Sequence, residues 1–213
     1  LLPYVANLKA VEAKADGQTE KLAQLLRAQG VEVFLCAEPE ALVSWADIII
    51  PSPGVSPQNP LLSEAQKQKT PIVSELEVAF WLAKAPIIAV TGTNGKTTTA
   101  TLIKEILCQA GYNALLGGNI GKPFIEIAAA DCDWLVIEVS SFQLAYTTTF
   151  KPKIAVLLNL QEDHLDWHSS FVAYKQAKHK VYLNQTKDDF LIYNALDKNC
   201  LPQKCKATAF GIG

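Results

Sequence analysis

The feature that most constrains the fold is a glycine-rich turn between an apolar segment and an amphipathic one. Residues 86–90 (PIIAV) are typical of a central parallel strand, and residues 97–110 place their leucines and isoleucines on one helical face. Between them runs TGTNGKTT, where Gly92 and Gly95 allow a tight turn that points N–H groups at phosphate oxygens. This strand–turn–helix order predicts an α/β fold that binds a nucleoside triphosphate.

The turn matches only the second half of the G-x-x-x-x-G-K-[ST] motif, because Val90 stands where the first glycine belongs. We expect Lys96 to reach the β- and γ-phosphates of ATP and the Thr97 hydroxyl to ligate Mg²⁺. A glycine-rich turn that binds nothing is the weaker alternative, since the lysine and threonine also fall in the right context. The residues expected to contact ATP are Gly92, Thr93, Asn94, Gly95, Lys96, Thr97 and Thr98.

Composition narrows the class of protein. The 213 residues are 49% hydrophobic and 19% charged, which suits a globular chain with one large or two small domains. A net charge of −2 without a basic block gives no sign of a nucleic-acid partner, and no apolar run predicts membrane insertion. Five cysteines without C-x-x-C spacing indicate free thiols in a reducing cytosol. Because methionine is absent, we expect the chain to be part of a larger protein.

Alternating helical and strand-like segments predict two α/β units, residues 1–84 and 85–213, with the boundary near 83–86. In the first unit we expect strands at 5–7, 31–35, 47–50 and 71–73 and helices at 18–29, 60–69 and 75–84. In the second unit we expect strands at 86–90, 134–138, 153–158 and 190–193 and helices at 97–110 and 171–184. Short apolar runs of this kind favour a buried parallel sheet, whose ligands bind at the carboxyl ends of the strands.

Polar residues follow two of these strands. Glu138 ends an apolar run, where its carboxylate could hold Mg²⁺ or simply face solvent. Ser140 and Gln143 follow at once, and by residue type alone they are equally suited to bind a polar substrate or to cap the next helix. Residues 159–168 hold three acids and two histidines, among them His164, which suits a divalent cation, acid–base work or a solvated acidic turn. Lys178 lies in a charged helical run, which by itself indicates a solvated face.

Taken together, these segments resemble the Mur ligases, which build the peptide stem of the bacterial cell wall. TGTNGKTT resembles their ATP loop, including the missing first glycine. EVSSFQL at 138–144 resembles the D-glutamate-adding branch, because relatives that add diaminopimelate or lysine usually have histidine in place of Phe142. The likeness runs from about residue 47 to 213 and also includes SPG at 52–54, GGNIG at 117–121, EDHLD at 162–166 and Y-x-x-A-K at 174–178.

The resemblance implies a role for each motif. The catalytic residues that it implies are Lys96, His164 and Lys178. The residues that it places near Mg²⁺ are Thr97, Glu138, His164 and, if carbamylated, Lys178. The residues that it implies for holding a UDP-muramoyl substrate are Ser52, Asn119, Ser140 and Gln143.

The resemblance also implies a fold and a reaction. The fold is α/β, with an incomplete Rossmann-like N-terminal domain followed by a P-loop ATPase domain with a mainly parallel sheet. The reaction is ATP-dependent addition of D-glutamate to UDP-N-acetylmuramoyl-L-alanine through an acyl phosphate, carried out in the bacterial cytoplasm by a protein that is monomeric at full length. The family's C-terminal amino-acid-binding domain is absent from this sequence, so we expect the fragment alone to be inactive.

Two other functions remain open. A Mur-like ligase of the folylpolyglutamate synthase type would share the ATP loop, but residues 117–119 and 142–144 argue against it. A non-catalytic nucleotide-binding module would need the loop and would have no use for Lys178 or for Ser140 and Gln143.

Overall fold

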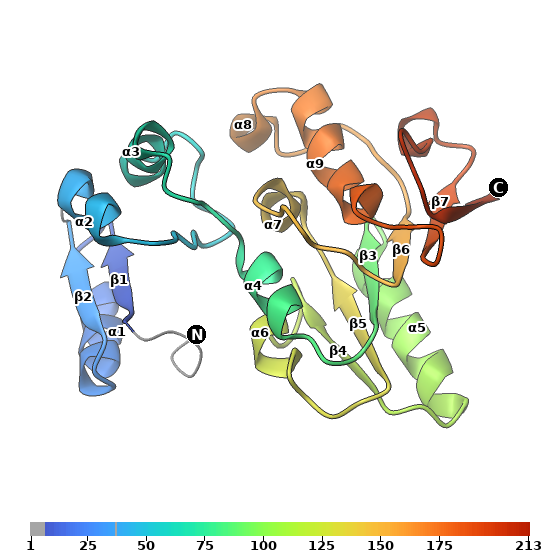
Figure 1. The fold of residues 1–213 in the computed structure, drawn as a ribbon, viewed down its shortest axis with the longest axis horizontal. Coiled ribbons are helices and arrows are strands. Elements are labelled where there is room, and N and C mark those ends of the chain that lie inside the picture. The colour runs from blue at the N-terminus through green and yellow to red at the C-terminus, as the bar shows by residue number, and fades with distance from the viewer. Residues whose placement is uncertain (1–6, 37) are drawn as a thin grey trace.

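The computed structural model describes residues 7–36 and 38–213, in which strands and helices alternate (Figure 1). The strands are β1 (Lys9–Glu12), β2 (Glu32–Leu35), β3 (Ile87–Thr91), β4 (Ala114–Gly118), β5 (Trp134–Glu138), β6 (Ile154–Leu157), β7 (Phe190–Asn194) and β8 (Thr208–Ile212). The helices are α1 (Gly17–Ala28), α2 (Pro39–Trp45), α3 (Pro60–Gln68), α4 (Glu75–Leu82), α5 (Lys96–Gln109), α6 (Phe124–Ile127), α7 (Ser141–Ala145), α8 (Leu165–His168) and α9 (Phe171–Leu183), with a short 3₁₀ helix η2 (Lys198–Cys200).

The larger part of the chain is built on a six-stranded sheet with the strand order β4-β5-β3-β6-β7-β8. Every pairing in this sheet is parallel, and Val90 of β3 stands opposite Glu138 of β5 and Val156 of β6. The carboxyl ends of all six strands therefore meet at one edge, which is where ligands bind in sheets of this kind. The predicted α/β class with a mainly parallel sheet is confirmed.

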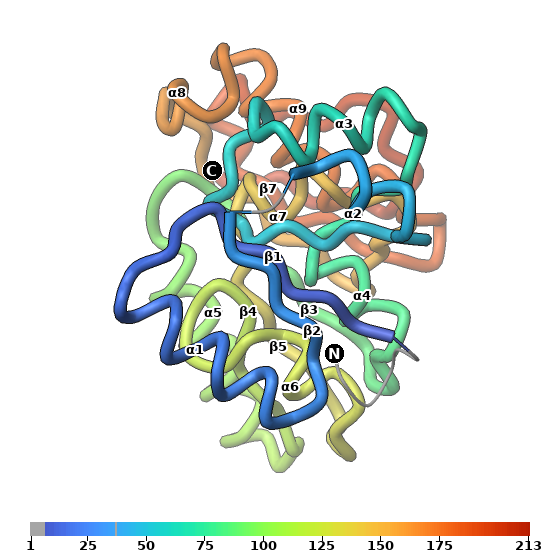
Figure 2. The backbone as a smooth tube through the Cα atoms, turned by 90° about the vertical axis from the view of Figure 1, so that its left-hand side faces the viewer, coloured from blue at the N-terminus to red at the C-terminus, as the bar shows by residue number. Residues whose placement is uncertain are grey.

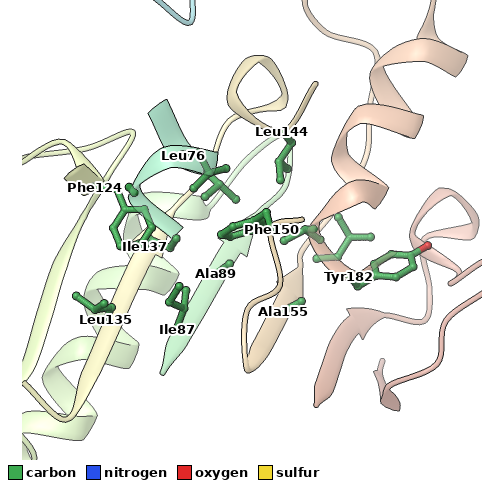
Figure 3. Close-up of a cluster of buried hydrophobic side chains, with 14 of the residues drawn as sticks. Leu76, Ile87, Ala89, Phe124, Leu135, Ile137, Leu144, Phe150, Ala155 and Tyr182 are labelled. Atoms are coloured by element: carbon green, nitrogen blue, oxygen red, sulfur yellow. The ribbon is translucent and has the colours of Figure 1, made fainter. Parts of the chain in front are cut away.

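The two faces of the sheet are covered by different helices. In β3, Ile87 and Ala89 face a large core, while Ile88 and Val90 face a smaller one. The large core, drawn in Figure 3, joins the sheet to α4, α6, α7 and α9 through Leu76, Phe124, Leu144, Phe150 and Tyr182. The small core packs the other face against α5 through Ala100, Ile103 and Leu107. Because successive strand residues point to opposite faces, continuous apolar runs are what a sheet covered on both sides requires.

The face of the sheet beside α5 is only partly covered. A groove of about 510 Å³ lies where α5 meets the carboxyl-terminal halves of β6 and β7, lined in part by Ile103, Val156, Ile192 and Ile212. Among the described residues, no helix is both long and apolar enough to cross a membrane.

The N-terminal part forms a separate small layer beside the sheet (Figures 1 and 2). Strands β1 and β2 pair in parallel, and α1 begins at a capping box in which the Asp16 side chain accepts from the N–H groups of Gln18 and Thr19. Helix α4 leads from this part into the sheet. A hydrogen bond from Trp167 Nε1 to the Val55 carbonyl, 3.0 Å long, connects the loop after α2 to α8.

Most expected elements are confirmed, with bounds shifted by a residue or two. The strands expected at 47–50 and 71–73 are wrong, because these segments meet only in a single bridge between Ile49 and Ile72. Of the strand expected at 5–7, residues 5 and 6 lie outside the described residues. The sequence analysis does not predict β1, β4, β8, α2, α6 and α8, since these elements are short and β4 ends in two glycines.

Candidate functional site

The glycine-rich turn connects β3 to α5 and leaves the start of this helix open. Gly95 is the residue before the helix and has φ of +82°, a left-handed conformation that side chains other than glycine rarely adopt. Among the described residues, no side chain caps α5. The N–H groups of the first helical turn have no partner within a helix, and here they coincide with the positive end of the helix dipole. The turn is therefore suited to hold an anionic phosphate group.

The loop is held by the segment that follows β6. The Asn159 side chain accepts from Asn94 N (2.8 Å) and donates to Asn94 O (3.0 Å), while its backbone carbonyl accepts from Thr93 N (2.9 Å). The Lys96 amine curls back over the loop and donates to the carbonyls of Gly92 (3.0 Å) and Thr93 (2.9 Å). The Lys96 amine thus lies over the loop, while the contacts with Asn159 fix the loop backbone.

Glu138 meets the loop from the neighbouring strand. Its carboxylate is 2% exposed and accepts hydrogen bonds from Thr97 Oγ1 (2.6 Å) and Asn119 Nδ2 (2.9 Å). A glycine is needed opposite Glu138, because Gly118 has φ of +102° and a Cβ there would lie 2.3 Å from the backbone carbonyl oxygen of Glu138. The solvent-facing alternative for Glu138 is therefore wrong, and the structure brings together three residues that the sequence singled out separately.

Lys178 is buried at the same edge of the sheet. Its side chain is among the large ones that are fully enclosed, and its amine donates to Gly92 O (2.9 Å) and contacts Thr91 Oγ1 (3.4 Å). Burial, and secondarily the charge of Lys96, lowers the pKa of Lys178 to about 7. The solvated face indicated by residue type alone is wrong, because Lys178 lies on the side of α9 that packs under the loop.

Ser140 and Gln143 form a capping box at the start of α7. Gln143 Oε1 accepts from both the backbone N and the hydroxyl of Ser140, at 3.0 Å each, and the hydroxyl in turn accepts from Gln143 N (3.2 Å). Both residues are buried. The capping interpretation is confirmed by this geometry, and their role toward a substrate stays a prediction.

His164 projects from the loop after β6 beside an aromatic cluster. Its φ is +52°, its side chain is 46% exposed, and its ring lies 4.7 Å from that of Phe142. Its Nε2 is 3.4 Å from Asp163 Oδ2. Phe142 of α7 also stacks on His168, with 5.7 Å between ring centroids, so α7 packs against both ends of the segment that presents His164.

Ser52 lies at the surface, in a turn where its carbonyl accepts from Val55 N (2.9 Å). The hydrogen bond from Trp167 to Val55 sets this turn against α8. The structure therefore does not bring the Ser52 side chain into the cluster around the loop, and its predicted substrate role stays a prediction.

The structure adds residues that the sequence reasoning did not assign to the site. In the sequence, Asn159 belongs only to the acidic segment 159–168, and Tyr174 only to the Y-x-x-A-K motif. Tyr174 is fully buried, and its hydroxyl lies 2.8 Å from Thr93 Oγ1. His168 Nε2 lies 2.9 Å from the buried Ser141 hydroxyl, and burial lowers the pKa of His168 to about 4. Only the spacing of Tyr174 and Lys178, one helical turn apart, could have suggested that both face the loop.

Comparison with known families identifies this arrangement. The model of the Mur ligase middle domain matches residues 90–212, which include the loop, Glu138, His164 and Lys178. The chain belongs to the Mur ligase family. Its resemblance to that family in sequence is thereby confirmed, and the match covers the whole sheet except the first strand residues of β3.

Curated relatives place the chain more closely. It is 44% identical over 210 residues to the UDP-N-acetylmuramoylalanine–D-glutamate ligase of Lactococcus lactis subsp. cremoris (strain MG1363), which covers 95% of this chain and 47% of the relative. It is 49% identical over 154 residues to the ligase of the same name from Citrifermentans bemidjiense, covering 71% of this chain and 34% of the relative. The chain therefore spans about half the length, or less, of these curated Mur ligases.

Solved structures share the fold. The UDP-N-acetylmuramate:L-alanyl-γ-D-glutamyl-meso-diaminopimelate ligase from Neisseria meningitides matches with a TM-score of 0.55 and 18% identity, over 96% of this chain and 70% of that one. A MurF ligase from Thermotoga maritima in complex with ADP also matches with a TM-score of 0.55, at 14% identity, over 97% of this chain and 48% of that one. At these identities the likeness establishes the Mur ligase architecture alone.

Proposed function

We propose that the complete gene product adds D-glutamate to UDP-N-acetylmuramoyl-L-alanine at the expense of ATP, in bacterial peptidoglycan synthesis. The observation that carries this proposal is the convergence of Lys96, Glu138 and Lys178 around one uncapped helix start. Similarity to D-glutamate ligases at 44–49% identity supports the choice of amino acid. Activity, substrates and partners are proposed for the whole protein, because the chain spans about half the length, or less, of the relatives it matches.

The nucleotide loop supplies the phosphate contacts in this proposal. The free N–H groups at the start of α5 and the amine of Lys96 bind the β- and γ-phosphates of ATP, with Thr93, Asn94 and Thr98 forming the rest of the loop. To do so, the Lys96 amine exchanges its two carbonyl acceptors for phosphate oxygens. The charge of the amine then offsets negative charge that builds on the transferred phosphoryl group.

Thr97 and Glu138 fit a magnesium ion at the loop. Mg²⁺ is usually held by one or two carboxylates together with substrate phosphates, and a hydroxyl and a carboxylate lie 2.6 Å apart here. No cluster of three or more His, Cys, Asp or Glu side chains suited to a metal occurs in the ranges that the structure covers. Phosphate oxygens would therefore complete the ligand set. The ion supplies charge neutralisation for the phosphoryl group.

We propose that Lys178 becomes carbamylated. Because its pKa is lowered to about 7, a substantial share of the amine is neutral near pH 7 and can attack CO₂, forming an N–C bond and releasing a proton. The product is an anion beside Lys96, and at this buried position an anion is more favourable than a second cation. Such a carbamate, together with His164, whose ring lies 6.4 Å from that of Tyr174, would offer oxygen and nitrogen ligands to a second Mg²⁺.

The substrates occupy the polar surface beyond these groups. The substrate carboxylate takes the phosphoryl group to form an acyl phosphate, and the amine of D-glutamate then displaces phosphate. Ser52, Asn119, Ser140 and Gln143 are proposed to hold the UDP-muramoyl part. Residues 1–84 are assigned to a partial substrate-binding domain and residues 85–213 to a partial ATP-binding domain of a monomeric enzyme. Five free cysteines support a cytoplasmic location.

The reaction is tested by following ADP release from Mg-ATP with the complete gene product. UDP-N-acetylmuramoyl-L-alanine is present throughout, and D-glutamate, L-glutamate or a diamino acid is added in turn. Release that depends on D-glutamate supports the proposal. Release with another amino acid alone keeps the ligase chemistry and overturns the proposed substrate.

A second test separates a ligase from a nucleotide-binding module. Lys178→Ala should abolish amino-acid-dependent ADP release, whereas the Kd for ADP, measured by calorimetry, should rise no more than roughly tenfold, as expected for the loss of one loop hydrogen bond. A variant that retains turnover would show that Lys178 is not part of the reaction. A wild-type protein that binds ADP without any amino-acid-dependent release would favour the module.

A further inference from the structure

Helix α9 supports the nucleotide loop from below through two residues. Tyr174 and Lys178 are one helical turn apart and lie on the same face of the helix. The Lys178 amine donates to the carbonyl of Gly92, while the Tyr174 hydroxyl meets the side chain of Thr93, the next residue. The Lys178 amine also lies 5.1 Å above the Tyr174 ring. Two consecutive loop residues are therefore held by consecutive turns of one helix.

The hydrogen bonds of Thr93 determine the direction of the contact with Tyr174. The Thr93 hydroxyl accepts from Gln161 N (3.0 Å) and donates to Gln161 O (3.2 Å). A hydroxyl has one donor and two acceptor sites, so the remaining site is an acceptor. Tyr174 must then donate its proton to Thr93, across 2.8 Å. Burial raises the pKa of Tyr174, which keeps this proton in place.

We propose that Tyr174 is a positioning residue for the nucleotide loop, whose hydroxyl locks Thr93 so that the loop is preformed before the phosphates arrive. The hydroxyl completes a junction of three segments: the loop, residues 159–161 after β6, and α9. A loop fixed in its bound conformation loses less entropy when a ligand binds. The ligand in this inference, a nucleoside phosphate, rests on the proposed function, whereas the lock itself is a property of the free protein.

The variant that tests the lock is Tyr174→Phe, which keeps the buried ring and removes only the hydroxyl. Thr93→Val tests the same contact from the other side. Tyr182→Phe is a matched control, because Tyr182 is equally buried on the same helix and its hydroxyl bonds to His179 Nδ1 (2.9 Å) and Gln203 N (3.1 Å) instead. All variants are made in the complete gene product.

Amide hydrogen exchange, measured by NMR without nucleotide, reports directly whether the Tyr174 hydroxyl holds the loop. The reporters are the N–H groups of Thr93 and Asn94, both of which donate to Asn159. Tyr174→Phe should speed their exchange roughly three- to tenfold, as expected for the loss of one buried hydrogen bond. Tyr182→Phe should leave these two amides unchanged. Unchanged exchange in Tyr174→Phe, or an equal effect of Tyr182→Phe, overturns the proposal.

Calorimetric titration with ADP gives the second readout. Tyr174→Phe should raise the Kd for ADP roughly three- to tenfold, and Tyr174→Phe combined with Thr93→Val should bind like Thr93→Val alone. Additive losses in the double variant would show that the two side chains act independently and would overturn the lock. If the wild-type protein does not bind ADP, the proposed function fails, and the exchange measurement still decides whether Tyr174 holds the loop.

Discussion

Glu77 offers the sharpest test of what holds the fold together. This residue of α4 is fully buried, and its carboxylate collects five hydrogen bonds from three consecutive residues. The donors are the N–H and hydroxyl groups of Thr148 and Thr149 and the N–H group of Phe150. Burial alone raises the pKa of Glu77, but the bonds from Thr149 and Thr148 outweigh it and hold the pKa below its ordinary value. The charge therefore stabilises the link between α4 and the loop that leads into β6.

The change Glu77→Gln keeps the shape and removes the charge and one acceptor. The least costly orientation places the new NH₂ group where Oε1 stands, because the two threonine hydroxyls there can rotate and accept. The Thr149 N–H, now 2.6 Å from Oε1, is then left facing a donor. One orphaned buried N–H costs about 2 kcal/mol, and weakening the retained charge-assisted bonds adds about 1–2 kcal/mol. We expect a total loss of about 3–4 kcal/mol in the free energy of unfolding.

Urea unfolding followed by circular dichroism measures this loss, provided that the slope of the unfolding free energy against urea is unchanged. Glu105→Gln is the matched control, because the Glu105 side chain is 53% exposed and, within the described residues, forms its ion pair with Lys104 alone. It should shift stability by less than about 0.5 kcal/mol. A loss below about 1 kcal/mol for Glu77→Gln would refute the reasoning that five donors depend on the buried charge.

Three further predictions concern the site. In bicarbonate-free buffer, the free energy of unfolding should rise between pH 7 and 10.5, because there the unfolded chain binds a proton at Lys178 that the folded state does not. Lys178→Met should remove this rise; if urea unfolding gives the variant a pH profile parallel to that of the wild type, the prediction is contradicted. His168 should titrate near pH 4 by NMR, so that its share of stability, up to about 3 kcal/mol, is lost as the pH falls from 6.5 to 4; titration above pH 6 would contradict this. Gly118→Ala should lower the free energy of unfolding by at least about 3 kcal/mol and displace Glu138. The control Gly111→Ala, at φ of +89° and with no described atom within 4 Å of its new Cβ, should lower it by about 1–2 kcal/mol, and thermal unfolding measures both losses.

The nucleotide loop and the sheet around it could be predicted from the sequence because their signals are local. The glycines, lysine and threonine of residues 91–98 fall between an apolar strand and an amphipathic helix, and each constrains the backbone at its own position. Residues 134–137 of β5 are apolar throughout, as a strand buried on both faces must be. Since all strands are parallel, their polar ends were bound to meet at one edge.

Other features depended on contacts between residues far apart in the chain. The charges around Lys178 favoured a solvated helix face, yet the packing of α9 under the loop buries this amine against Gly92, 86 residues away. The strand β8 lies at the edge of the sheet with exposed residues, and it forms only because β7 offers it free backbone groups. A sequence pattern reports the local conformation and the polarity of a segment. Which charge is desolvated, and which backbone groups pair, is decided by neighbours that only the tertiary structure brings together.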